Sequence, residues 1–204
     1  MSLLLEDASV AAEVLRETLA EYDGLRLEED ERAALRDRLP ELAAIRAAHP
    51  DDLGVQAVCA RAYRKLGELD DAEACAERAV ALERTFDTLT ALATVHRVRK
   101  RSEEAVLLFD EVSRLDPADT TSLAEGGDVL RFVGRYAEAA TRYEEALRRD
   151  PDHSWALVML ALVRFRLSGD PAFSAAIVAT ARSEGAGIDW VEEVADQVSP
   201  GWRG

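Results

Sequence analysis

The most informative stretch of the sequence is GDVLRFVGRYAEAATRYEEALRRDP, residues 127–151. Ala139 and Ala146 lie seven residues apart, which is two helical turns, so both fall on one face of a helix. Small residues such as these and Gly127 let two helices approach closely, while Tyr143 fills the space between neighbours. The stretch therefore predicts two closely packed helices that end at Asp150-Pro151.

The same pattern recurs upstream with a regular period. Pro50, Pro117 and Pro151 stand in acidic turns and are separated by 67 and 34 residues, so units of 33–34 residues fit both gaps. Ala72 and Ala79 repeat the seven-residue spacing in the first unit. A two-helix unit of about 34 residues is a known repeat length. The periodicity predicts an all-α protein with about twelve helices in antiparallel pairs.

These spacings over residues 53–153 resemble the tetratricopeptide repeat (TPR) family. The resemblance implies a right-handed α-α superhelix, a TPR solenoid, with N-terminal capping helices and a C-terminal solvating helix. We expect the following organisation: capping helices in 1–52, repeats in 53–85, 86–119 and 120–153, a degenerate repeat in 154–187, and a C-terminal helix and tail in 188–204.

The ends of the chain follow the repeat pattern less closely. Residues 9–22 predict one helix, and residues 27–49 predict a second that is kinked at Pro40. In the degenerate repeat, Pro171 suits the first turn of a helix capped by Asp170. Residues 188–198 predict an amphipathic helix that covers the last apolar face of the array.

The composition excludes several classes of function. The 204 residues are 48% hydrophobic and carry a net charge of −15, which disfavours nucleic acid and anionic membranes as partners. The start of the chain shows no signal peptide, and the longest apolar run, Trp155 to Val163, is too short to span a membrane. We therefore expect a cytoplasmic protein.

The sequence offers no recognisable catalytic, cofactor-binding or metal-binding residues. We expect His96 to pack in the core and His49 and His153 to stand in turns between repeats. Cys59 and Cys75 fall on paired helices, so a disulfide is possible, although reduced thiols suit a cytoplasm. No nucleophile stands in a recognisable elbow and no glycine-rich loop follows a strand, which indicates a protein that is not an enzyme.

The family resemblance implies that the first helix of each repeat lines a concave groove. The first helices, 53–66, 86–99, 120–133 and 154–167, hold eight basic and three acidic residues, a net of +5, so the rest of the chain carries −20. By analogy, the predicted partner-binding residues are Arg61, Arg64, Lys65, Arg97, Arg131, Phe132, Trp155, Phe165 and Arg166. Trp and Arg are frequent binding hot spots, but residues 188–198 could instead cover the aromatic end as core.

The chain contains no asparagine, which TPR grooves commonly use to hold an extended peptide backbone. Of the positions matching the clamp for chaperone tails, only Arg61 is basic. The sequence therefore favours an interaction module, an adaptor, scaffold or chaperone-like protein, that binds an acidic or helical partner. The alternatives are a self-associating structural protein, monomeric or homodimeric, and the regulatory subunit of an enzyme.

Overall fold

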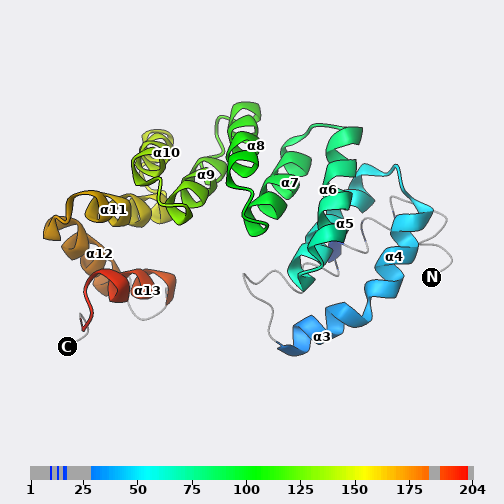
Figure 1. The fold of residues 1–204 in the computed structure, drawn as a ribbon, viewed down its shortest axis with the longest axis horizontal. Coiled ribbons are helices and arrows are strands. Elements are labelled where there is room, and N and C mark those ends of the chain that lie inside the picture. The colour runs from blue at the N-terminus through cyan, green and yellow to red at the C-terminus, as the bar shows by residue number, and fades with distance from the viewer. Residues whose placement is uncertain (1–9, 11–12, 14–15, 18–28, 184–188, 202–204) are drawn as a thin grey trace. The chain divides into compact units, whose positions relative to one another are not determined.

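The computed structural model describes residues 10, 13, 16–17, 29–183 and 189–201. The chain divides into two compact units, Met1–Leu115 and Asp116–Gly204, here called the N-terminal and C-terminal units. The described residues contain eleven helices with assigned bounds, labelled α3 to α13, which pack in antiparallel pairs (Figure 1). This confirms the predicted all-α class. Most of the predicted helix over 9–22 lies outside the described residues.

The N-terminal unit consists of two short helices followed by two helix pairs. The short helices are α3 (Glu29–Asp37) and α4 (Leu39–Ala48). The pairs are α5 (Leu53–Leu66) with α6 (Leu69–Leu82), and α7 (Phe86–Val98) with α8 (Ser102–Leu115). Leu35, Leu42 and Ile45 are buried in a common core with residues of α5 to α7, so the two short helices cover the first repeat.

The predicted kink at Pro40 is a break two residues earlier. The helix expected over 27–49 divides at Arg38 into α3 and α4, and Pro40 occupies the first turn of α4. Proline has no backbone N–H to donate, and a helix tolerates this only in its first turn, where such donors have no intrahelical acceptor. The chain therefore restarts a helix at Leu39 rather than bending a continuous one.

Each helix pair turns at a residue with left-handed backbone. Gly67, Gly134 and Gly169 have φ of 82°, 80° and 68° and follow the first helix of their pairs. In the α7–α8 turn the equivalent residue is Lys100, with φ of 61°. A side chain disfavours this conformation because the Cβ atom approaches the following carbonyl. The second repeat thus has a strained turn where the other three have glycine.

We expect Lys100→Gly to raise the free energy of unfolding by about 1 kcal/mol, because glycine adopts positive φ without strain. Urea denaturation followed by circular dichroism measures the change. Lys100→Ala is the matched control, since it removes the side chain but keeps a Cβ atom. If the alanine variant is stabilised as much as the glycine variant, the strain argument is wrong.

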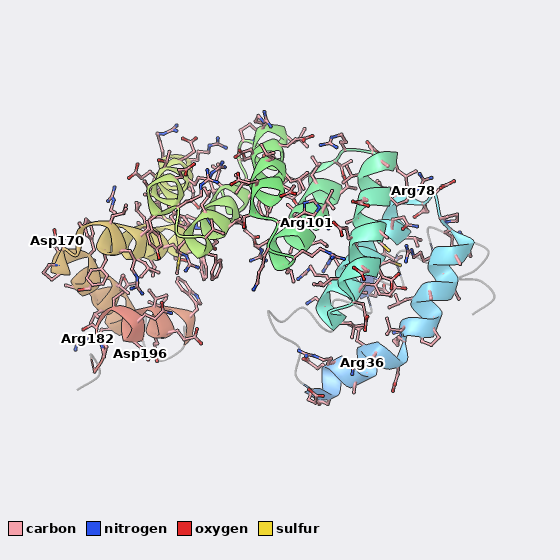
Figure 2. All side chains as sticks on the ribbon, in the orientation of Figure 1. Arg36, Arg78, Arg101, Asp170, Arg182 and Asp196 are labelled. Carbon is pink, nitrogen blue, oxygen red and sulfur yellow. The ribbon has the colours of Figure 1, made fainter. Side chains whose placement is uncertain are left out.

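A buried carboxylate joins the first two repeats. Glu73 of α6 is buried, and its Oε2 lies 3.0 Å from Nε of Arg99. Arg101, labelled in Figure 2, donates a hydrogen bond to Glu73 Oε1, and His96 Nε2 lies 3.4 Å from the same oxygen. His96 is buried, as predicted, but it belongs to a polar cluster rather than to purely apolar packing.

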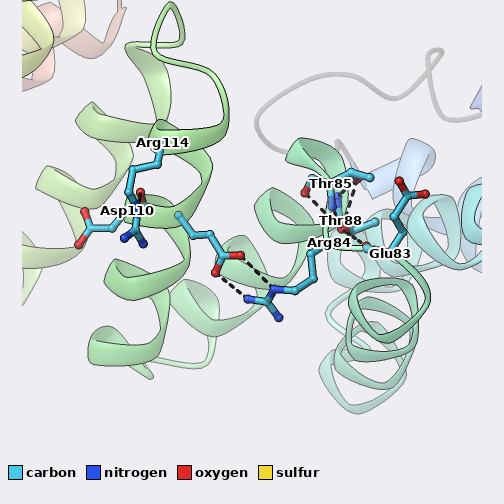
Figure 3. Close-up of polar contacts among 7 residues, drawn as sticks. Glu83, Arg84, Thr85, Thr88, Asp110 and Arg114 are labelled. Carbon is cyan, nitrogen blue, oxygen red and sulfur yellow. Dashed lines mark hydrogen bonds and ion pairs between the residues drawn. The ribbon is translucent and has the colours of Figure 1, made fainter.

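The turn between α6 and α7 is held by two sets of polar contacts (Figure 3). Thr85 and Thr88 form a capping box, in which each side chain accepts from the backbone N–H of the other. Arg84 donates from Nε and Nη2 to the two carboxylate oxygens of Glu111 on α8, at 2.9 and 2.6 Å. These contacts fix the start of α7, where the second repeat begins.

The Arg84–Glu111 pair is expected to make a small, pH-dependent contribution to stability. The hydrogen bonds from Arg84 lower the pKa of Glu111, so the contribution is present above the ordinary glutamate pKa and is lost as the pH falls through the lowered value. Because the pair is exposed, we expect under about 1 kcal/mol. Melting temperatures between neutral and acidic pH, compared with Arg84→Gln, measure it. Equal acid sensitivity of both proteins would contradict this assignment.

The C-terminal unit contains α9 (Thr121–Phe132), α10 (Tyr136–Arg149), α11 (Ser154–Ser168), α12 (Pro171–Ser183) and α13 (Asp189–Val198). Asp170 Oδ1 accepts from the backbone N–H of Ala172 at 2.9 Å, so it caps α12 as predicted. Val191, Val194 and Ala195 of α13 are buried. The α13 helix packs on α11 and α12, as expected of a helix that covers the end of the array.

Candidate functional site

The N-terminal unit has a cavity of about 510 Å³ between the first helices of its two repeats. From α5 it is lined by Gly54, Ala57, Arg61 and Arg64, which recur at intervals of three and four residues. From α7 it is lined by Asp87, by the adjacent Thr90 and Ala91, and by Thr94, which are three or four residues apart from one level to the next. This spacing places each set on one face of its helix, so the cavity follows from the periodicity of the repeats.

The cavity is lined by small side chains and by hydroxyl groups. Gly54, Ala57 and Ala91 contribute small side chains, which leave room between the helices. Thr90 and Thr94 present hydroxyl groups; that of Thr94 donates to the backbone carbonyl of Thr90 at 2.8 Å. The Thr90 hydroxyl is buried and has no hydrogen-bond partner among the described residues. The cavity can thus receive a side chain and offer it a polar contact.

The charge of the cavity is opposite to that of the chain. Among the described lining residues, Arg16, Arg61 and Arg64 are basic and only Asp87 is acidic, whereas the chain carries −15. Arg61 is exposed and Arg64 is half-buried. A positive site on a negative protein attracts anionic groups locally while the rest of the surface repels them.

Two other predicted groove residues of this unit lie outside the cavity lining. Lys65 is half-buried near the end of α5. Arg97 is half-buried near the end of α7, and its Nε atom is buried. The cavity therefore brings together Arg61 and Arg64 of the predicted set, and it adds Arg16, Asp87 and the threonines, which the sequence analysis did not select. The helical spacing of Asp87, Thr90 and Thr94 was the signal that could have identified them.

In the C-terminal unit, predicted groove residues surround a buried acid. Asp128 is buried; its Oδ1 accepts from the Tyr143 hydroxyl at 2.7 Å and from Arg131 at 3.2 Å. Its Oδ2 accepts from Trp155 Nε1 at 2.8 Å. Burial and the neighbouring carboxylate raise the pKa of Tyr143, which keeps its hydroxyl protonated as a donor. Arg131 and Trp155 are thus engaged within the unit.

Trp155 also contacts the last helix. Its ring centroid lies 4.7 Å from that of Trp190 on α13, with the planes tilted by 48°. The α13 helix therefore covers part of Trp155, which is half-buried. Phe165 is half-buried and Arg166 is exposed. Phe132 is 71% exposed, and the Arg131 guanidinium lies over its ring at 4.3 Å from the ring centroid. Of the predicted aromatic residues, Phe132 offers the most surface to a partner.

The described part of the chain contains no group of three or more His, Cys, Asp or Glu side chains that could hold a metal ion. None of its helices is long and apolar enough to cross a membrane.

Consecutive antiparallel helix pairs define the class of this protein, which is an all-α helical-repeat protein. The tetratricopeptide repeat family model matches residues 60–120 and 125–187. The chain belongs to the tetratricopeptide repeat family.

Individual relatives agree with this classification. The chain is 28% identical to the DnaJ homolog subfamily C member 7 homolog of Schizosaccharomyces pombe, over 56% of this chain and 28% of that protein. The fold is similar to a crystal structure of MamA protein (TM-score 0.62, 16% identity, 97% of this chain and 93% of that one). It is also similar to YrrB, described as a TPR protein with an unusual peptide-binding site (TM-score 0.54, 15% identity, 83% and 80% covered).

Proposed function

We propose that this protein is a non-catalytic interaction module that binds a partner protein in the cavity between α5 and α7. The observation that carries the proposal is a cavity whose described lining holds three arginines and one aspartate, on a chain of net charge −15. TPR proteins bind peptides and proteins, which supports the general role. The charge contrast supports an acidic partner, because the site attracts anionic groups that the remaining surface repels.

The size and chemistry of the cavity support recognition of a short helical or folded segment. A volume of about 510 Å³ accommodates a few side chains rather than a whole domain. Arginine donates paired hydrogen bonds to carboxylates, so Arg61 and Arg64 suit Asp or Glu side chains of the partner. The buried Thr90 hydroxyl offers one more polar contact. YrrB, a repeat protein of similar fold, is described as having a peptide-binding site, which is consistent with this role.

We further propose that the protein acts in the cytoplasm and without nucleic acid as a partner. The two free thiols support a reducing compartment, and the acidic charge opposes binding to phosphate backbones. The chain spans only 28% of the length of its DnaJ-type relative, so that relative assigns no partner here.

Charge reversal at the cavity is expected to weaken partner binding strongly without unfolding the protein. We would capture partners from lysate with the wild-type chain and measure their affinity for Arg61→Glu/Arg64→Glu. The dissociation constant is expected to rise at least tenfold, because attraction becomes repulsion, and wild-type binding is expected to weaken as salt rises. The melting temperature is expected to change little, since Arg61 is exposed and Arg64 is only half-buried, and such charges contribute about 1 kcal/mol or less each. Arg97 is omitted because its Nε is buried.

The matched control is Arg36→Glu/Arg114→Glu, which changes the net charge equally within the same unit. Arg36 on α3 (labelled in Figure 2) and Arg114 on α8 (labelled in Figure 3) are exposed. Neither residue lines the cavity. Partner binding is expected to survive in this control. Equal loss of affinity in both double variants would mean that overall charge, not the cavity, controls binding.

A second candidate function is self-association through the C-terminal unit. Large apolar side chains of this unit are exposed at Phe132, Val133, Leu157 and Leu167. Exposed apolar patches often mark protein interfaces. Light scattering of the purified chain distinguishes the two roles: a monomer mass favours the adaptor, and a concentration-dependent dimer favours the self-associating alternative.

A further inference from the structure

Cys59 and Cys75 lie at nearly the same height in the first helix pair. Cys59 stands seven residues before the end of α5 at Leu66, and Cys75 stands six residues after the start of α6 at Leu69. At 1.5 Å of rise per residue, two antiparallel helices joined by a short turn bring these positions to within about 1.5 Å of the same level. Both side chains are buried, with 0% exposure.

The two thiols contact each other. The Cys59 thiol donates a hydrogen bond to the Cys75 sulfur; this bond raises the pKa of Cys59 and lowers that of Cys75. The Arg46 guanidinium of α4 also lowers the pKa of Cys75, against the effect of burial. The pair is therefore asymmetric: Cys75 ionises more readily, and Cys59 holds the proton.

A surface cleft adjoins this pair. Arg46, Tyr63 and Asp71 line an open cleft of about 560 Å³ between α4, α5 and α6. Arg46 Nη1 donates to Asp71 at 2.9 Å, and its guanidinium lies 5.9 Å from the Tyr63 ring centroid. On one face of α5, Cys59 stands between the lining residues Gln56 and Tyr63, and on one face of α6, Cys75 stands between Asp71 and Arg78. This spacing places the buried thiols behind the wall of the cleft.

We propose that Cys59 and Cys75 are a redox modification site that forms an intramolecular disulfide when hydrogen peroxide enters this cleft. In the first step the Cys75 thiolate attacks one peroxide oxygen and the O–O bond breaks. This gives a sulfenic acid on Cys75 and hydroxide, which takes up the proton released by the thiol to form water. In the second step the Cys59 sulfur attacks Cys75 Sγ and expels hydroxide, which takes the Cys59 proton as water. Peroxide is reduced to two waters, and two thiols are oxidised to one disulfide.

The cross-link would fix the helix pair that carries one wall of the binding cavity. It would join α5, which presents Arg61 and Arg64, to α6 and enclose 15 residues between the two cysteines. A disulfide that closes a loop of this length restricts the unfolded chain. We therefore expect the oxidised protein to melt several degrees higher than the reduced protein.

Treatment of the purified full chain with hydrogen peroxide tests the proposal. After unfolding in guanidinium, thiol titration is expected to fall from two thiols to none, with a mass loss of about 2 Da, no disulfide-linked dimer, and full reversal by dithiothreitol. The melting temperature is expected to rise on oxidation and to return on reduction. Retention of both thiols, a gain of oxygen without the loss of two hydrogens, or cross-linking only between chains would overturn the proposal.

Single variants test the assigned roles of the two sulfurs. In Cys59→Ser the remaining Cys75 is expected to accumulate as a sulfenic acid that dimedone traps. In Cys75→Ser, the remaining Cys59 is expected to stay reduced at the same peroxide dose. Equal reaction of the two variants would contradict the order of steps. Even if a variant fails to fold, the thiol titration and the mass of the wild-type chain show whether the disulfide forms.

Discussion

Replacing Gly127 with leucine is expected to lower the free energy of unfolding by about 3 kcal/mol or more, because the helices have no room for a side chain there. A Cβ atom built at Gly127 would lie 2.8 Å from Cε1 of Tyr143 and 3.0 Å from its Cζ. The Tyr143 ring is fully buried, and its hydroxyl is held by Asp128, so it has little freedom to move. Urea denaturation measures the loss.

A double-mutant cycle separates this clash from other effects of the substitution. Gly127→Ala alone is expected to destabilise, although alanine favours helices over glycine by about 1 kcal/mol. In a Tyr143→Leu background, which removes the ring, the same alanine is expected to cost much less or to stabilise. If the free-energy changes of the two substitutions simply add, the Gly127 substitution does not clash with the Tyr143 ring.

Removing the Asp128 carboxylate is expected to cost about 3–5 kcal/mol of stability, because it leaves three donors without their acceptor. The Tyr143 hydroxyl, the Trp155 indole and the Arg131 guanidinium all donate to this one buried group. Asp128→Ala should therefore lower the melting temperature sharply. Trp155→Ala should lower it as well, since the ring packs on Trp190.

Asp152→Ala is the control for Asp128→Ala. Asp152 is an exposed aspartate of the same unit, so its removal is expected to change stability by less than about 0.5 kcal/mol. If Asp128→Ala were as stable as this control, the hydrogen bonds to the Asp128 carboxylate would not be what stabilises the C-terminal unit. An Asp128→Asn variant, which retains one acceptor oxygen, is expected to lie between the two.

The repeats could be predicted because their signal is local in sequence. Ala139 and Tyr143 are four residues apart, so both lie on the same face of one helix, and both are buried. Pro40 was harder to interpret, since the same residue suits a kink or a helix start, and only the backbone distinguishes the two. Lys100 takes the position that glycine has in the other turns, so its left-handed conformation could not be read from its residue type.

The candidate site was predictable only where a single helix supplied the evidence. Arg61 and Arg64 share one face of α5, and both line the cavity. The Asp128 cluster depends on partners 15 and 27 residues away, on α10 and α11, so the sequence alone left Trp155 undecided between hot spot and core. Arg16 comes from outside the repeats, where no family spacing applies.

Site-specific photo-crosslinking tests the central claim, that the α5–α7 cavity holds the partner. A photoreactive benzophenone amino acid would replace Asp87, an exposed residue lining the cavity, or Glu104, an exposed residue of α8 outside it. We predict that the captured partner crosslinks to the Asp87 position and not to the Glu104 position, and that Arg61→Glu/Arg64→Glu removes the crosslink. A partner that crosslinks at Glu104 but not at Asp87 would contradict the account.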